Sequence, residues 1–153
     1  MAIKSFVSAK VEDKSRQSSQ ILVADIMTTN LIVFHPDQSV IEVMASIVKN
    51  KISGGPVVDS QGQLIGIISE GDCIKEISDS RYYNMPMASH KVHEFMVKDV
   101  DVLDSNMDIF EVCSLFQKNK RRRFPVMRDG KLVGQISQID VLKAILEAQH
   151  QAW

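Results

Sequence analysis

Two short stretches of the sequence carry the same residues that could hold a ligand. Both read glycine, two strand-forming positions, serine, two variable residues and aspartate, and they give the pairs Ser69/Asp72 and Ser137/Asp140. A serine at the start of a helix can present its hydroxyl and free N–H groups to a phosphate, while the carboxylate accepts hydrogen bonds from ribose hydroxyls. The same spacing also produces an ordinary helix cap without any ligand. Both interpretations stay open at this point.

The two motifs belong to a longer internal repeat. Met27 matches Met96 and Glu42 matches Glu111 at a separation of 69 residues, and the separation becomes 68 after a turn that follows residue 58. An insertion confined to a turn is typical of a duplicated structural unit. The chain therefore consists of two related halves.

Apolar periodicity predicts the elements of the first half. A helix should begin at Val40, because apolar residues follow at helical spacing. A hairpin over residues 56–68 should belong to a covered sheet, because its strands are apolar throughout. A short helix over residues 70–78 should follow, with Ile74 and Ile77 facing the core.

The second half repeats this order. Its first helix has an apolar face made by Ile109, Val112, Cys113 and Phe116. A hairpin over residues 124–136 follows, and a longer helix begins near Gln138. The predicted apolar face of that helix is Ile139, Leu142, Ile145 and Leu146. Cys73 and Cys113 are interpreted as small buried hydrophobic residues rather than as a disulfide or metal ligands.

The repeat also sets the expected domain organisation. The predicted segments are an N-terminal arm or linker (1–21), repeat 1 (22–79), a linker (80–91), repeat 2 (92–148) and a C-terminal tail (149–153).

The order strand, helix, two strands and helix, repeated once and opened each time by a methionine, resembles a stand-alone tandem pair of cystathionine β-synthase (CBS) domains, the Bateman-type module. The resemblance covers residues 22 to 148. It implies an α/β (α+β) fold of two β-α-β-β-α units packed through their sheets with pseudo-twofold symmetry. It also implies assembly as a homodimer and adenosine-containing ligands bound in the cleft between the units.

The resemblance further implies which residues bind the nucleotide. The aspartates would hold ribose, the serines would approach phosphate, and the segments before the hairpin strands would line the base pocket through backbone groups. The candidate residues are Ser53, Gly54, Gly55, Pro56, Val57, Ser69, Asp72, Arg122, Arg123, Phe124, Pro125, Val126, Ser137 and Asp140. The possible ligands are AMP, ADP, ATP, S-adenosylmethionine and NAD, and no cofactor is expected to be obligatory.

The two halves differ where the first hairpin strand begins. Residues 51–56 read Lys-Ile-Ser-Gly-Gly-Pro, whereas residues 120–125 read Lys-Arg-Arg-Arg-Phe-Pro. Glycines allow a close approach of a ligand or a second backbone, and arginines supply forked donors for phosphate. The basic run could also be a solvated helix end, a nuclear-localisation signal or a nucleic-acid patch. The two clefts are therefore chemically unequal. Domains that this chain resembles often carry a basic residue in this segment, and its absence from the first half leaves phosphate binding there an open question.

These observations favour a non-enzymatic regulatory module that senses an adenosine nucleotide and responds by a conformational or oligomeric change. The alternative is a ligand-free interaction or assembly module whose Ser/Asp pairs are only caps. The sequence offers no paired general acid and base, no nucleophile with an activating histidine and no Walker A loop, so we do not expect an enzyme. His90 and His93 lack further ligands in sequence, and no metal site is expected.

The composition limits the kinds of partner that the protein can have. The formal net charge is −1 over 153 residues, which argues against a general nucleic-acid or membrane-surface binder. No apolar run is long enough to span a bilayer, and the N-terminus is too polar for a secretory signal. A cytoplasmic protein is expected, with an adenosine nucleotide, a second copy of the chain and an unidentified protein target as partners.

Overall fold

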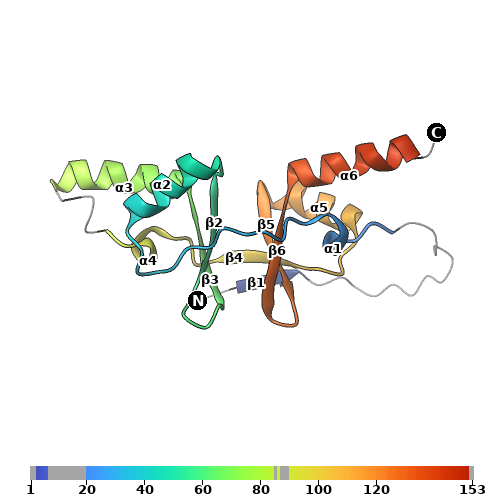
Figure 1. The fold of residues 1–153 in the computed structure, drawn as a ribbon, viewed down its shortest axis with the longest axis horizontal. Coiled ribbons are helices and arrows are strands. Elements are labelled where there is room, and N and C mark those ends of the chain that lie inside the picture. The colour runs from blue at the N-terminus through green and yellow to red at the C-terminus, as the bar shows by residue number, and fades with distance from the viewer. Residues whose placement is uncertain (1–2, 7–19, 85, 87–89, 152–153) are drawn as a thin grey trace. The chain divides into compact units, whose positions relative to one another are not determined.

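The computed structural model describes residues 3–6, 20–84, 86 and 90–151 (Figure 1). The chain forms two compact units, and neither is a continuous stretch of sequence. Among the described residues, unit 1 is built from Ile3 and residues 32–100. Unit 2 is built from residues 4–6, 20–31 and 101–151. Each unit is described by itself below.

Unit 1 contains a β-hairpin and its helices. In chain order its elements are α2 (Val40–Asn50), β2 (Gly54–Val58), β3 (Leu64–Ser69), α3 (Glu70–Tyr83) and α4 (Val92–Phe95). Strands β2 and β3 pair antiparallel, and Phe34 adds a parallel bridge to Val57. The predicted hairpin and the predicted helix from Val40 are confirmed.

Unit 2 repeats this order around a larger sheet. Its elements are β1 (Ile3–Phe6), α1 (Val23–Ile26), β4 (Val100–Asp104), α5 (Ile109–Asn119), β5 (Arg123–Arg128), β6 (Lys131–Ser137) and α6 (Gln138–Gln151). The first residues of β1 and β4, Ile3 and Val100, are the exceptions, since they belong to unit 1. The strand order is β1-β4-β5-β6, with β4 parallel to β5 and β5 antiparallel to β6. The predicted mixed α/β fold is confirmed, although strand β1 was not expected within the N-terminal arm.

Local signals in the sequence fix the start of α2 in unit 1 and of α5 in unit 2. Ser39 Oγ accepts a hydrogen bond from Glu42 N at 3.2 Å, which caps the start of α2, and Asp108 Oδ1 accepts one from Phe110 N at 2.7 Å at the start of α5. Both helices end at a lysine in the left-handed conformation, a usual way to stop a helix.

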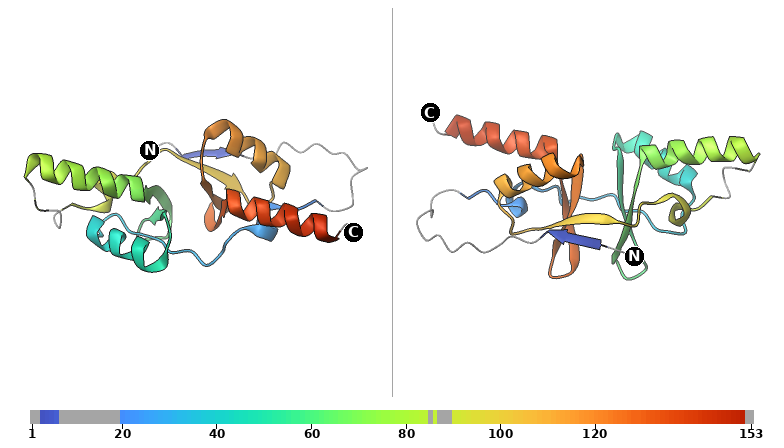
Figure 2. Two further views of the ribbon diagram at one scale, coloured as in Figure 1. Left: turned by 90° about the horizontal axis from the view of Figure 1, so that it is seen from above. Right: turned by 180° about the vertical axis from the view of Figure 1, so that it is seen from behind.

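The start of each sequence repeat packs into the unit formed by the other repeat (Figure 2). Val23 is fully buried in the core of unit 2, where its N–H donates to Met107 O at 2.9 Å. Val92 is fully buried in the core of unit 1, where its N–H donates to Gln38 O at 2.9 Å. The repeats seen in the sequence and the compact units therefore have different boundaries.

A methionine and a glycine fasten each of these exchanged segments. In unit 2, Thr28 and Gln135 exchange backbone hydrogen bonds of 2.8 and 3.0 Å beside Gly134. A Cβ atom on Gly134 would lie 2.7 Å from Met27 Sδ. In unit 1, a Cβ atom on Gly66 would lie 2.8 Å from Met96 Sδ. These glycines are required because another segment crosses the strand in close contact.

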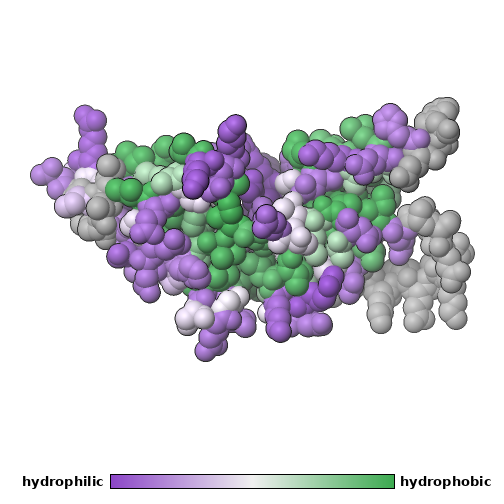
Figure 3. Space-filling model, viewed as in Figure 1, coloured by the Kyte–Doolittle hydropathy of each residue, from purple (hydrophilic) through white to green (hydrophobic). Residues whose placement is uncertain are grey.

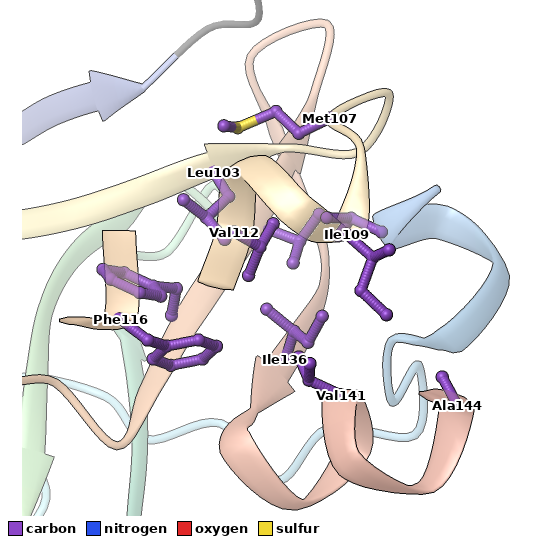
Figure 4. Close-up of a cluster of buried hydrophobic side chains, with 11 residues drawn as sticks. Leu103, Met107, Ile109, Val112, Phe116, Ile136, Val141 and Ala144 are labelled. Carbon is purple, nitrogen blue, oxygen red and sulfur yellow. The ribbon is translucent and has the colours of Figure 1, made fainter. Parts of the chain in front are cut away.

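Each unit has its own apolar core. In unit 2, side chains from β4, α5, β6 and α6 converge on one cluster (Figure 4). The rings of Phe116 and Phe124 also belong to it, and their centroids lie 4.8 Å apart. The buried members are Val23, Leu103, Met107, Ile109, Val112, Phe116, Phe124, Val126, Ile136, Val141 and Ala144. The smaller cluster of unit 1 is Phe34, Val40, Val43, Val57, Ile68, Cys73 and Val92.

Several predicted core positions were wrong. The isoleucines of α3 predicted to face inward are exposed, and so are most of the predicted apolar face of α6 and the thiol of Cys113 in α5. The exposed residues are Ile74, Ile77, Cys113, Ile139, Leu142 and Leu146. Helix α3 also extends to Tyr83 rather than to residue 78, and it turns Cys73, Glu76 and Ser80 inward instead.

A buried polar cluster explains how polar residues of α3 can face the interior. Glu76 Oε1 lies 2.9 Å from His90 Nδ1 and accepts the hydroxyl of Ser80 at 2.7 Å. The His90 ring also packs beside Phe95. Hydrogen bonds to Glu76 Oε1 offset part of the cost of burying these groups, while Oε2 is buried without a partner among the described residues. The apolar periodicity could not show this cluster.

We expect Gly134→Ala to lower the free energy of unfolding by about 1–3 kcal/mol, because the new methyl group would overlap Met27 Sδ and Thr28 O. Chemical denaturation measures the effect. Gly71→Ala is the control, since its Cβ would be no closer than 3.7 Å to another group. An unchanged stability of Gly134→Ala would contradict the close crossing.

The two cysteines should react differently. Burial raises the pKa of the Cys73 thiol from 9.0 to about 11, with further contributions from Asp72 and Glu76. At pH 8 we expect iodoacetamide to modify Cys113 in the native protein and Cys73 only after unfolding, as counted by mass spectrometry. Because the unfolded thiol ionises first, stability should also fall as the pH rises from about 9 to 11. Rapid native labelling of Cys73 would contradict this burial.

Candidate functional site

Each Ser/Asp pair lies where the second hairpin strand becomes a helix. Ser69 ends β3 and Asp72 lies in the first turn of α3, whereas Ser137 ends β6 and Asp140 lies in the first turn of α6. The apolar strand holds the serine at its end, and the helix begins at the next residue. The structure thus places both pairs at the strand–helix junctions expected from the sequence.

In unit 1 the pair forms a closed cap. Asp72 Oδ2 accepts Ser69 N at 2.8 Å and the Ser69 hydroxyl at 2.9 Å. Ser69 Oγ in turn accepts Asp72 N at 3.4 Å. The serine hydroxyl hydrogen is therefore already used by the carboxylate.

In unit 2 the same cap is more open. Asp140 Oδ2 accepts Ser137 N at 2.8 Å, and Ser137 Oγ accepts Asp140 N at 3.2 Å. The structure gives no bond from the Ser137 hydroxyl to Asp140, so this hydroxyl can still donate to a ligand. The interpretation of the motif as a helix cap is confirmed in geometry for both units.

Capping and ligand binding can use different atoms of the same aspartate. The hydrogen bonds that close the caps engage Oδ2 of Asp72 and of Asp140. The cap fixes the orientation of the carboxylate, and Oδ1 has no hydrogen-bond partner in the described part of the chain. Each carboxylate therefore keeps one oxygen that can accept a further hydrogen bond.

The segments before the first hairpin strands lie beside these caps. Gly54 pairs with Ser69, and Arg123 pairs with Ser137. Ser53 O accepts Glu70 N at 2.8 Å, which binds this segment to the start of α3. The structure therefore brings the outer residues of both predicted segments together with the Ser/Asp pairs.

The inner residues of these segments belong to the cores. Gly55, Pro56, Val57, Phe124, Pro125 and Val126 are buried, as is the outer residue Gly54. The ring of Phe124 packs against Phe6 and Phe116, so it is not available as a stacking surface. Only backbone groups of these inner residues could meet a ligand.

The close approach at Gly54 is made by the protein itself. Its φ is +151°, and a Cβ atom there would lie 2.3 Å from Ile68 O. This glycine is therefore required by the hairpin, whether or not a ligand is present.

Three consecutive arginines of unit 2, residues 121–123, lie at the edge of this site. Arg121 Nε pairs with Asp101 Oδ2 at 3.3 Å, Arg122 is exposed and Arg123 is half-buried. Gln138 connects the arginines to the helix, because its N–H donates to Arg122 O at 3.2 Å and its amide donates to Arg121 O at 3.1 Å. Gln138 and its counterpart Glu70 were only variable positions in the sequence motif.

His90 and His93 do not belong to these sites. His90 belongs to the buried cluster of unit 1, and His93 is exposed. Among the described residues, no group of three His, Cys, Asp or Glu side chains is placed to hold a metal ion. Within the same part of the chain, no helix combines the length and apolar character needed to cross a membrane.

Comparison with known families gives a match over most of the chain. The model of the CBS domain matches residues 23–79 and again residues 92–147. The chain belongs to the CBS-domain family. Its two matches make it a tandem CBS pair, which confirms the resemblance noted in the sequence.

Relatives of this CBS pair include whole proteins and parts of enzymes. An uncharacterized protein of Methanocaldococcus jannaschii, MJ1426, is 30% identical, with 82% of this chain and 92% of that protein covered. Inosine-5′-monophosphate dehydrogenase of the same organism is 31% identical over 87% of this chain, but the match covers only 25% of the enzyme.

Solved structures share the fold. CBSX2 in complex with AMP has a TM-score of 0.74 and 29% identity, covering 84% of this chain and 98% of that chain. CBSX2 from Arabidopsis thaliana is also similar, at 26% identity and a TM-score of 0.74, over 86% of this chain and 99% of that chain. The CBS domain pair of MJ0100 in complex with 5′-methylthioadenosine and S-adenosyl-L-methionine has a TM-score of 0.70 and 25% identity, covering 82% and 99%.

We expect Asp72→Ala and Asp140→Ala each to lower the free energy of unfolding by about 1 kcal/mol, because each removes the acceptor of a cap. Chemical denaturation without ligand measures this. Asp79→Ala removes the same charge from the interior of α3 and should not destabilise, since alanine favours helix. Equal stability of Asp72→Ala and the wild type would show that the cap contributes nothing.

Proposed function

We propose that this CBS pair is a non-enzymatic regulatory module that binds adenosine-containing ligands at its Ser/Asp sites. The observation that carries the proposal is the carboxylate of each site, which the cap holds at a strand–helix junction with Oδ2 engaged. Binding of AMP by the similar protein CBSX2 supports the ligand class.

The recognition chemistry follows from the groups at each site. Oδ1 of the aspartate accepts ribose hydroxyls, and the serine with the N–H groups at the helix start receives the 5′ substituent. Backbone groups of Ser53, Gly54, Arg122 and Arg123 meet the base. The other predicted contacts, Gly55 to Val57 and Phe124 to Val126, act through their backbone at most, since their side chains are buried.

Signalling would be a shift in population between arrangements of the chain. A ligand moves such an equilibrium only by its difference in affinity for the two arrangements. The response would be read by a second copy of the chain and by a separate protein target. The partial match to inosine-5′-monophosphate dehydrogenase gives no reason to assign that activity here.

Exposed apolar side chains on the helices support association with a second copy. Apolar surface lies along α6 and over α2 and α3 (Figure 3). Ile139, Leu142 and Leu146 on α6 are 57, 58 and 60% exposed, and Val48 on α2 is 78% exposed. Patches of this kind on a soluble domain usually mark an interface. The same surface would serve a ligand-free assembly module, which is the alternative function.

A ligand screen by thermal unfolding separates the two functions. At about 100 times its dissociation constant, AMP, ADP, ATP, S-adenosylmethionine or NAD should add about 2.7 kcal/mol to the stability. This corresponds to a rise in Tm of about 5–10 °C for a chain of this size. Asp140→Ala should abolish the rise for a ligand of unit 2, whereas Glu147→Ala on the surface of α6 should preserve it. No rise with any compound, in protein free of co-purified nucleotide, would favour the assembly module.

A further inference from the structure

The two sites differ in charge directly beside the serine. Glu70 follows Ser69, whereas Gln138 follows Ser137. Their backbone N–H groups make the same bond, Glu70 to Ser53 O and Gln138 to Arg122 O, so the two side chains start from equivalent positions. Unit 1 therefore has a carboxylate where unit 2 has a neutral amide.

The strand that pairs with the serine carries a positive charge in unit 2 and none at the equivalent position in unit 1. Arg123 pairs with Ser137, while the equivalent partner of Ser69 is Gly54. No side chain can replace that glycine, since its Cβ would collide with Ile68 O and Ser69 Cα. The preceding residue is Arg122 in unit 2 and Ser53 in unit 1. The backbone geometry of unit 1 thus excludes an arginine at position 54, the position that pairs with Ser69.

The hydroxyl groups of Ser69 and Ser137 also differ between the two units. The Ser69 hydroxyl donates to Asp72 at 2.9 Å, whereas no such bond holds the Ser137 hydroxyl. Among Ser53, Gly54, Ser69, Glu70 and Asp72 there are two carboxylates and no basic group. The five equivalent residues of unit 2 carry one carboxylate and two arginines.

We infer that the two sites take different chemical classes of adenosine compound. The site of unit 2 binds an adenosine phosphate, because its arginines and free hydroxyl match a phosphate group that carries close to two negative charges at pH 7. The site of unit 1 binds an adenosine compound whose 5′ substituent is uncharged or cationic, because Glu70 and Asp72 repel phosphate. This inference rests on the proposed function.

Titration calorimetry of the full chain with two probes tests the division. AMP should bind to one site per chain, and Asp140→Ala should abolish this binding while Asp72→Ala preserves it. 5′-Methylthioadenosine, which has no phosphate, should still bind to Asp140→Ala, and adding Asp72→Ala to that variant should abolish its binding. Two AMP sites of similar affinity, each lost with one aspartate, would overturn the inference.

Exchanging residues between the units tests whether the charge beside the serine determines which ligand each site binds. Gln138→Glu should weaken AMP on the order of tenfold with little effect on 5′-methylthioadenosine, because it adds a charge beside the phosphate. Gln138→Ala should weaken AMP less, since it removes only the amide donor to Arg121 O. Gln149→Glu adds the same charge about 16 Å further along α6 and should leave AMP binding unchanged. Equal effects of Gln138→Glu and Gln138→Ala would overturn the charge argument.

The reverse exchange should create a phosphate site. Ser53→Arg combined with Glu70→Gln should give unit 1 an AMP site that Asp140→Ala does not remove. Failure of this double variant to bind AMP, while it keeps its fold and its affinity for 5′-methylthioadenosine, would overturn the inference but not the proposed function. Failure of the wild type to bind either probe would overturn both.

Discussion

The structure depends on the exchange of two short segments between the sequence repeats. Val23 completes the core of unit 2, and Val92 completes the core of unit 1. Each segment then lies against a strand whose glycine leaves no room for a methyl group. The strand that receives the segment ends at the Ser/Asp pair. The contact that closes each core therefore also supports the strand–helix junction that could hold a ligand.

A helix cap and a ligand site are compatible at that junction. The cap uses one carboxylate oxygen and holds the side chain in a single orientation. The aspartate side chain therefore loses little further conformational entropy when a ligand binds. The second oxygen and the helix N–H groups supply the polar contacts. The choice of ligand would then depend on the residues around the aspartate, which differ between the units.

Much of this arrangement could be predicted because it is local in sequence. The helix cap at Ser69 and the hairpins follow from residue type and spacing. The exchange of Val23 and Val92 could not be predicted, because a repeat in sequence does not show which copy a segment packs against. The orientation of α3 was also missed: a hydrogen-bonded Glu76 faces inward while Ile74 is exposed, contrary to the apolar pattern. The role of the difference between Glu70 and Gln138 depends on their position beside the caps, which the repeat pattern alone does not specify.

The position of AMP in a crystal structure of this protein tests the central claim most directly. The account predicts AMP at unit 2, with ribose hydroxyls donating to Asp140, the phosphate beside Ser137 and Arg122, and the bond from Ser137 N to Asp140 Oδ2 retained. AMP bound away from Asp140, or bound equally at Asp72 with its phosphate beside Glu70, would contradict it.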